Sequence, residues 1–310
     1  MSIAIYTKNE KESQKWEQVL KSNLQNETIE IYPDISNLES VTFLVCWKPE
    51  ENLLSKFPNL KAIQSLGAGV DHILDHHVVP SHIKVSKVVD DNLTHDMWEH
   101  TMSIILSDMK NLPIHAKNKM SKTWSPKRYK RIKDVSIGIL GLGTIGKYVA
   151  SQFAKTGFKV GGWSKSKKEV QNVITYSDES GLKSLLSVSD YVVNILPLTK
   201  ETSGIINHNL LSNMKQESYL INIGRGPHVV NADLLSNIDS GHLRGAALDV
   251  FHCEPLPKES PFWNHSSIII TPHTASLTHI DSVYPQVVVN YIRLIKGLHL
   301  FNLVDLSKGY

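Results

Sequence analysis

Three side chains that could hold an anion and move a proton follow strand-like apolar runs in the second half of the chain. Arg225 lies in INIGRGPHVV, Glu254 in ALDVFHCEPLP and His273 in IIITPHTAS. An arginine grips a carboxylate through paired N–H donors, and a histidine exchanges a proton near neutral pH, where a nearby carboxylate favours its charged form. Ligands of open parallel sheets collect beyond the carboxyl ends of strands. These residues therefore predict acid–base chemistry on a small anion.

A glycine-rich turn earlier in the same half has the form of a phosphate-binding loop. Gly141, Gly143 and Gly146 follow the apolar run VSIGIL and open the helix-length segment IGKYVASQFAKTG. The first glycine permits a tight turn, the second lets the backbone approach a pyrophosphate, and the third allows close packing of helix on strand. The start of the helix, at Thr144 and Ile145, presents free N–H groups to phosphate. We predict a dinucleotide site at these five residues.

The end of the next strand bears on which dinucleotide binds. NAD sites usually carry Asp or Glu about 20 residues after the turn, to accept a hydrogen bond from the ribose 2′-OH. Here the sequence is WSKSKK, with Ser164, Lys165 and Lys167. Hydroxyl and ammonium groups suit a 2′-phosphate, which a carboxylate would repel. We predict that NADPH is preferred and NADH is the weaker alternative; an ordinary basic surface turn is the competing interpretation.

The elements that must position these residues form two blocks. Apolar runs at residues 2–6, 41–47 and 59–65 alternate with longer amphipathic stretches, and six further apolar runs follow residue 134. Near-continuous apolar strands alternating with helices are typical of a parallel sheet covered on both faces, so we predict a doubly wound α/β fold. Residues 94–115 between the blocks predict a long amphipathic helix, with Thr94 as its N-cap.

The composition limits the class of protein. The 310 residues are 41% hydrophobic with a formal net charge of +3, which suits two domains but is too weakly basic to indicate nucleic-acid binding. The N-terminal sequence turns polar after a few residues, no apolar run reaches the length of a membrane span, and Cys46 and Cys253 form no CxxC motif. We expect a cytoplasmic protein without a membrane or nucleic-acid partner.

Two charged stretches have competing interpretations. Residues 110–133 hold nine Lys or Arg and no acid, interleaved with Trp124 and Tyr129. We interpret them as a solvated basic loop, and a nucleic-acid patch is the alternative. His72 and His76 would share a helix face, but zinc needs about three converging protein ligands, so we predict no metal site.

Six motifs in order along almost the whole chain resemble the D-isomer-specific 2-hydroxyacid dehydrogenases, above all their branch that reduces glyoxylate and hydroxypyruvate. They are SLGAGVDHIL, the glycine turn, LPLTKETSGIIN, NIGRGPHVV, GAALDVFHCEPLP and TPHTAS. The resemblance implies reduction of a small 2-oxo acid by NADPH, with His273 protonating the developing alkoxide, Glu254 keeping the imidazole protonated and Arg225 orienting the substrate. Formate dehydrogenases carry glutamine at the glutamate position, so Glu254 argues against that branch.

The resemblance also assigns further residues and a domain plan. It implies that the substrate carboxylate is bound by the backbone of Leu66, Gly67, Ala68 and Gly69 and that Trp47 walls the pocket. Pro197 and Asp249 would contact the cofactor. A Rossmann domain of residues 98–283 would be inserted in a flavodoxin-like substrate domain of residues 1–97 and 284–310, and the protein would form a homodimer.

Two alternatives stay open at this point. One is an NAD-linked dehydrogenase of the D-lactate or D-3-phosphoglycerate type, against which the missing acid after the second strand counts. The other is a nucleotide-sensing binding protein similar to the transcriptional corepressors of the superfamily. Those keep similar catalytic residues, so Arg225, Glu254 and His273 do not separate a sensor from an enzyme, whereas turnover of a 2-oxo acid would.

Overall fold

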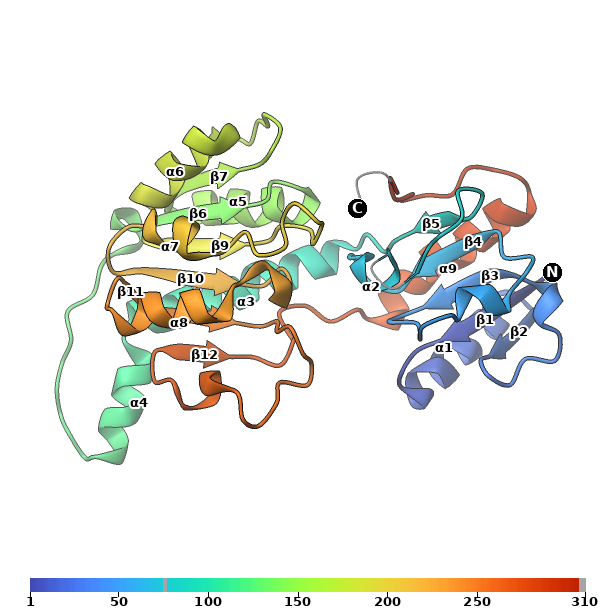
Figure 1. Ribbon diagram of the computed structural model, residues 1–310, viewed down its shortest axis with the longest axis horizontal. Helices are drawn as coiled ribbons and strands as arrows, with labels where there is room; N and C mark the ends of the chain where they lie inside the picture. The colour runs from blue at the N-terminus through green and yellow to red at the C-terminus, as the bar shows by residue number, and fades with distance from the viewer. Residues whose placement is uncertain (75–76, 307–310) are drawn as a thin grey trace. The chain divides into compact units, whose positions relative to one another are not determined.

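The computed structural model of the protein describes residues 1–74 and 77–306, which fold into two compact units (Figure 1). Unit 1 consists of Met1–Asn92 and Thr278–Tyr310, and unit 2 of Leu93–Leu277. The two domain boundaries predicted from the sequence, after residues 97 and 283, lie a few residues later than the unit boundaries of the structure.

Unit 1 is built on a parallel sheet of five strands. The strands are β1 (Ser2–Tyr6), β2 (Thr28–Ile31), β3 (Val41–Cys46), β4 (Ala62–Ser65) and β5 (Lys84–Ser86), in the order β2-β1-β3-β4-β5. The order turns back between β1 and β3, which is where such sheets bind ligands at their carboxyl ends. All six residues of β3 are buried, as the apolar run at 41–47 predicts.

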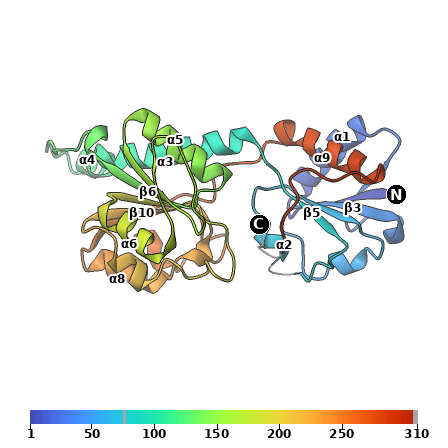
Figure 2. The ribbon, with the colours of Figure 1, turned by 90° about the horizontal axis from the view of Figure 1, so that it is seen from above.

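The helices of unit 1 complete its core. They are α1 (Glu10–Asn23), the short α2 (Asp71–Leu74) and α9 (Ile280–Ile295). Helices α1 and α9 pack against each other and lie on the same side of the sheet (Figure 2). The C-terminal stretch therefore belongs to the same core as the first residues of the chain.

Unit 2 is built on a parallel sheet of seven strands. The strands are β6 (Ser136–Leu140), β7 (Lys159–Trp163), β8 (Ile174–Tyr176), β9 (Tyr191–Asn194), β10 (Ser218–Asn222), β11 (Leu243–Leu248) and β12 (Ile268–Ile270), in the order β12-β11-β10-β9-β6-β7-β8. The chain builds outward from β6 to β8 and then returns to the other side of β6. The switch point therefore lies between β6 and β9.

Helices cover both faces of this sheet, which confirms the doubly wound fold. They are α3 (Asp91–Met109), α5 (Thr144–Thr156), α6 (Asp178–Val188), α7 (His208–Ser212) and α8 (Asn231–Asp239), whereas α4 (Leu112–Met120) has no buried residue. Ile139 and Val193 pack in one core with α3 and α5, while their neighbours Leu140 and Val192 pack in a second core with α6, α7 and α8. Successive strand residues thus enter opposite cores.

The long helix predicted over residues 94–115, between the two blocks, differs from its prediction. Helix α3 begins at Asp91, so Thr94 is a buried residue inside the first turns and not an N-cap. The helix ends at Met109, and a separate helix α4 follows after Asn111, whose φ of 56° is left-handed. Asparagine tolerates this conformation, and Pro113 suits the first turn of a new helix.

The basic segment beyond this break is exposed. No residue of α4 is buried, residues 121–130 contain no helix or strand, and Trp124 is 97% exposed. Within residues 1–74 and 77–306, no helix combines the length and the apolar character needed to cross a membrane.

Candidate active site

The glycine turn between β6 and α5 has the conformation that its sequence predicts. Gly141 has a φ of 103°, and a Cβ at Gly146 would lie 1.8 Å from the Gly141 carbonyl oxygen. The fold itself therefore requires these two glycines. A Cβ at Gly143 would meet no atom within 4 Å. Packing does not explain that third glycine, whereas close approach of a phosphate to the N-terminus of α5, at Thr144 and Ile145, does.

The turn after β7 carries hydroxyl and ammonium groups. Ser164 Oγ donates to the Ser166 carbonyl at 2.8 Å, and Lys165 Nζ lies 2.9 Å from Glu201 Oε2. Both side chains of that ion pair are more than two-thirds exposed, so it contributes little and exchanges readily for another anion. Lys167 is exposed in the same turn. These groups fit a 2′-phosphate.

A histidine and a glutamate form a hydrogen-bonded pair in the loops after β11 and β12. His273 Nδ1 lies 2.8 Å from Glu254 Oε2, and Glu254 Oε1 accepts the Phe251 N–H at 3.1 Å. The glutamate is therefore fixed at both oxygens, and it holds the imidazole through Nδ1. The His273 side chain is 32% exposed, so its other nitrogen, Nε2, is the one available to exchange a proton with a ligand.

Asp249, predicted to contact the cofactor, holds the backbone around His273. The His273 N–H donates to the Asp249 carbonyl, and the Thr274 and Ala275 N–H groups donate to its carboxylate, at 2.8, 2.8 and 2.9 Å. His273 has a left-handed φ of 55°, which is uncommon for a residue with a side chain. The cofactor contact of Asp249, whose side chain is 1% exposed, remains a prediction.

His100 of α3 lies beside this carboxylate. Its Nε2 is 4.0 Å from Asp249 Oδ1 and 3.4 Å from the Thr271 hydroxyl. Burial lowers the pKa of His100, and the negative charge of Asp249 opposes that shift without cancelling it. The connecting helix is thus tied to the loop that carries His273.

Arg225 and Pro197 lie in the loops after β10 and β9. Arg225 Nη1 donates to the Gly224 carbonyl at 2.8 Å, and the side chain is partly exposed. The Pro197 carbonyl accepts the Thr202 hydroxyl at 2.7 Å. Because all strands of the sheet are parallel, these loops leave the same edge of unit 2 as the glycine turn and the His273 loop (Figure 1).

The predicted substrate loop of unit 1 is packed on Trp47. A Cβ at Gly67 would lie 2.2 Å from the Trp47 ring, whose centroid is 4.3 Å from that of His72. The Ser65 hydroxyl accepts the Gly67 N–H and lies near the carbonyls of Gly67 and Gly69, which curls residues 66–69 (Leu66, Gly67, Ala68 and Gly69) around it. Trp47 and the loop are thus neighbours.

Of the two histidines predicted to share a helix face after this loop, the structure describes only His72. His76 lies outside the described residues, so its predicted pairing with His72 has no structural counterpart here. Among residues 1–74 and 77–306, no three His, Cys, Asp or Glu side chains converge as metal ligands would.

Comparison with known proteins identifies the family. Residues 102–275 match the model of the D-isomer specific 2-hydroxyacid dehydrogenase, NAD binding domain. The chain is 34% identical over 301 residues to a glyoxylate/hydroxypyruvate reductase A from Photorhabdus laumondii, covering 96% of each sequence. The chain belongs to the D-isomer-specific 2-hydroxyacid dehydrogenase family. It is therefore an NAD(P)-dependent oxidoreductase, as its six ordered motifs predict.

Solved structures of this dehydrogenase family match both units. A family member from Xanthobacter autotrophicus, in complex with NADPH and MES, superposes with a TM-score of 0.93 at 32% identity and covers 100% of this chain and 99% of its own. An NADPH-dependent glyoxylate/hydroxypyruvate reductase from Sinorhizobium meliloti, in complex with NADP and sulfate, gives 0.92 at 32% identity over the whole of both chains.

One group of polar residues in this dehydrogenase was not predicted. Asn194 and Asn222 end the neighbouring strands β9 and β10, and both contact His228 or its loop while fully buried. The signal in the sequence is a polar residue that ends two buried apolar strands, in DYVVN and SYLIN. It becomes informative only once the two strands are known to be neighbours.

Proposed function

We propose that the protein reduces a small 2-oxo acid, glyoxylate or hydroxypyruvate, to the 2-hydroxy acid with NADPH. The observation that carries the proposal is the 2.8 Å contact between His273 and Glu254, at the sheet edge from which the glycine turn also leaves. A positioned proton donor beside a dinucleotide site is what carbonyl reduction requires. The named activities of the relatives from Photorhabdus and Sinorhizobium support the same substrates.

The residues present fit NADPH. Gly141, Gly143 and Gly146 with the start of α5 would hold the pyrophosphate, and Ser164, Lys165 and Lys167 would hold the 2′-phosphate. When bound, NADPH supplies the hydride that is added to the carbonyl carbon. The bound NADPH and NADP of the two structural neighbours support this cofactor.

His273 would act as the general acid. Its Nδ1 is engaged by Glu254, so Nε2 is the atom that delivers a proton to the developing alkoxide. Glu254 stabilises the imidazolium before transfer and fixes the ring orientation. Arg225 would bind the substrate carboxylate and the carbonyl oxygen through its guanidinium fork, which stabilises the negative charge that develops on that oxygen.

We also propose that the loop after β4 binds the substrate. The backbone of Leu66–Gly69 would bind the carboxylate, and Trp47, which packs on that loop, would limit the size of the substrate side chain.

We extend the proposal to a homodimer. The exposed apolar side chains of Leu112, Met120 and Trp124 in and after α4 support it, since a partner would cover them. Sedimentation equilibrium tests the dimer directly.

The decisive experiment follows NADPH absorbance with glyoxylate, hydroxypyruvate, pyruvate and 2-oxoisocaproate, each repeated with NADH. We expect turnover with glyoxylate and hydroxypyruvate, and a higher kcat/KM with NADPH than with NADH. Equal or better efficiency with NADH would contradict the role of the Ser164–Lys167 turn. Absence of turnover with every acid and both cofactors would leave a nucleotide-binding protein instead of an enzyme.

A further inference from the structure

A buried polar network joins the loops that follow β9 and β10. Asn194, Asn222 and His228 are each 0% exposed. Asn194 Nδ2 donates to Asn222 Oδ1 and lies 2.9 Å from His228 Nδ1, and the two asparagines are directly paired in the parallel register of their strands. Polar groups at this depth are costly unless they are hydrogen-bonded. These hydrogen bonds therefore restrain the two loops that follow β9 and β10.

His228 holds a different loop at each side of its ring. Nδ1 accepts the Arg225 backbone N–H at 3.1 Å, so this nitrogen carries no proton. The proton must then lie on Nε2, which is 3.2 Å from the Pro197 carbonyl and donates to it. A neutral ring with a fixed tautomer thus bridges the loop of Arg225 and the loop of Pro197.

The backbone of Arg225 is held on both sides. His228 accepts its N–H, and Asn222 Nδ2 donates to its carbonyl at 3.0 Å. The next residue, Gly226, packs directly against the Phe251 backbone: a Cβ added there would lie 2.0 Å from the Phe251 carbonyl carbon. The loop therefore has no room to move inward. Since the Phe251 N–H donates to Glu254, a shift of this loop would also reach the catalytic pair.

We propose that His228 is a positioning residue for the reduction, a neutral clamp that fixes the Arg225 backbone against the Pro197 carbonyl. It keeps the arginine that orients the substrate in register with the loop that borders the cofactor. Imidazole suits this task because its acceptor and its donor sit on opposite sides of one rigid ring. The assignment rests on the proposed function, in which Arg225 binds the 2-oxo acid.

Two substitutions separate the two sides of the clamp. In His228→Asn the amide oxygen takes the place of Nδ1 and keeps the Arg225 N–H, but residue 228 no longer reaches the Pro197 carbonyl, which keeps its bond from the Thr202 hydroxyl. In His228→Gln the amide nitrogen reaches the position of Nε2 and keeps Pro197, but the Arg225 N–H loses its acceptor. The pair therefore serves as matched controls for each other.

The expected effects fall on different constants. His228→Asn should raise the Kd for NADPH about fivefold to tenfold, the usual effect of one lost hydrogen bond, with KM for glyoxylate nearly unchanged. His228→Gln should raise the KM for glyoxylate by a similar factor and leave the Kd for NADPH unchanged. A merely structural histidine would give parallel losses in both variants that follow their melting temperatures, and that result would overturn the proposal.

A second measurement does not depend on turnover. Long-range ¹H–¹⁵N correlation spectra of the ¹⁵N-labelled full chain, with His228→Gln identifying the signal, should show His228 as the neutral Nε2–H tautomer near neutral pH. The Nδ1–H tautomer or a charged ring would overturn the clamp even if the chain reduces glyoxylate. If no oxo acid is turned over, the proposed function fails, while the tautomer and the Kd for NADPH still decide on the clamp.

Discussion

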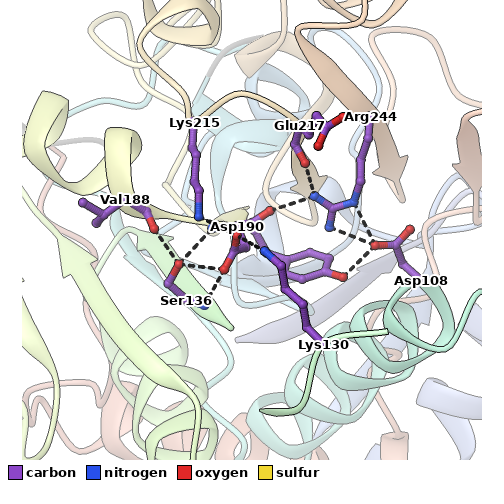
Figure 3. Close-up of polar contacts among 9 residues, drawn as sticks. Asp108, Lys130, Ser136, Val188, Asp190, Lys215, Glu217 and Arg244 are labelled. Atoms are coloured by element: carbon purple, nitrogen blue, oxygen red, sulfur yellow. Dashed lines mark hydrogen bonds and ion pairs between the residues drawn. The ribbon is translucent and has the colours of Figure 1, made fainter. Parts of the chain in front are cut away.

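The amino edge of the unit 2 sheet, opposite the site, carries a charged cluster centred on Asp190 (Figure 3). Asp190 Oδ1 accepts hydrogen bonds from Lys215 Nζ and Lys130 Nζ, at 2.8 and 3.0 Å. Asp190 Oδ2 accepts from the Ser136 N–H and hydroxyl, at 2.9 and 3.0 Å. Burial acts to raise the pKa of Asp190, but these bonds from Lys215, Ser136 and Lys130 outweigh it and hold the pKa far below its ordinary value.

We predict that Asp190→Asn destabilises unit 2 without affecting the chemistry. The side chain is 8% exposed, and an amide NH₂ would replace one of two acceptor oxygens and face a donor. An unsatisfied buried partner costs about 1–3 kcal/mol. Lys130 and Lys215 are 60% and 42% exposed and regain water, so the larger loss known for fully buried pairs does not apply. At about 2 kcal/mol, the Tm should fall by about 4–8 °C.

The pH dependence gives the sharper test. Because the folded pKa lies below the unfolded value of about 4, the stabilisation is complete above that value and is lost as pH falls through the folded pKa. Thermal melts followed by circular dichroism should show the full difference from wild type near neutral pH, and the difference should shrink as pH falls below about 4. Glu179→Gln, which removes an exposed ion pair with Lys183, is the control and should change the Tm little.

Either of two results would refute this account of Asp190. The first is a Tm for Asp190→Asn that equals that of the control near neutral pH. The second is a difference from wild type that stays constant down to the acid end of the range. A lower kcat in a variant that is still folded at assay temperature would contradict the separation of the two sheet edges.

Three substitutions test the site itself. Gly146→Ala adds a Cβ 1.8 Å from the Gly141 carbonyl oxygen; the turn must open, and fluorescence titration should show the Kd for NADPH raised at least about tenfold, or 1.4 kcal/mol. Arg225→Lys keeps the charge but loses the planar fork, so kcat/KM for the oxo acid should fall about 100-fold, as for one lost oxyanion donor; an unchanged value removes Arg225 from substrate binding. His273→Ala should lower kcat in steady-state assays about 10²- to 10⁴-fold at an unchanged Kd for NADPH, and full activity would overturn the mechanism.

The sequence predicts the strands that lie inside the sheets better than those at their edges. Every apolar run singled out in the sequence became a strand. The strands without such a signal are β2, β5 and β8, and all three lie at a sheet edge. Edge strands are short and partly exposed, so they do not need the continuous apolar pattern that reveals a central strand.

Contacts between distant segments explain most of what the sequence could not predict about the site. Asn194 and Asn222 look like ordinary strand ends until the register of β9 and β10 makes them neighbours. Lys165 reads as a free ammonium group beside the cofactor, and only the fold shows that Glu201 lies against it. In both cases the residue types were visible and the pairing was not.

Asp249 has a structural role that the sequence does not predict. The family resemblance implies a contact with the cofactor. In the structure, three successive backbone N–H groups, of residues 273–275, donate to the Asp249 carbonyl and to its two carboxylate oxygens. That grip accounts for the left-handed backbone of His273, which nothing in TPHTAS predicts. Asp190 binds its donors in a similar way, but two of them are ammonium groups, which tie segments together at the edge where no ligand is expected. Aspartate therefore stabilises the fold at one edge of the sheet, as Asp190, and shapes the backbone of His273 at the other, as Asp249.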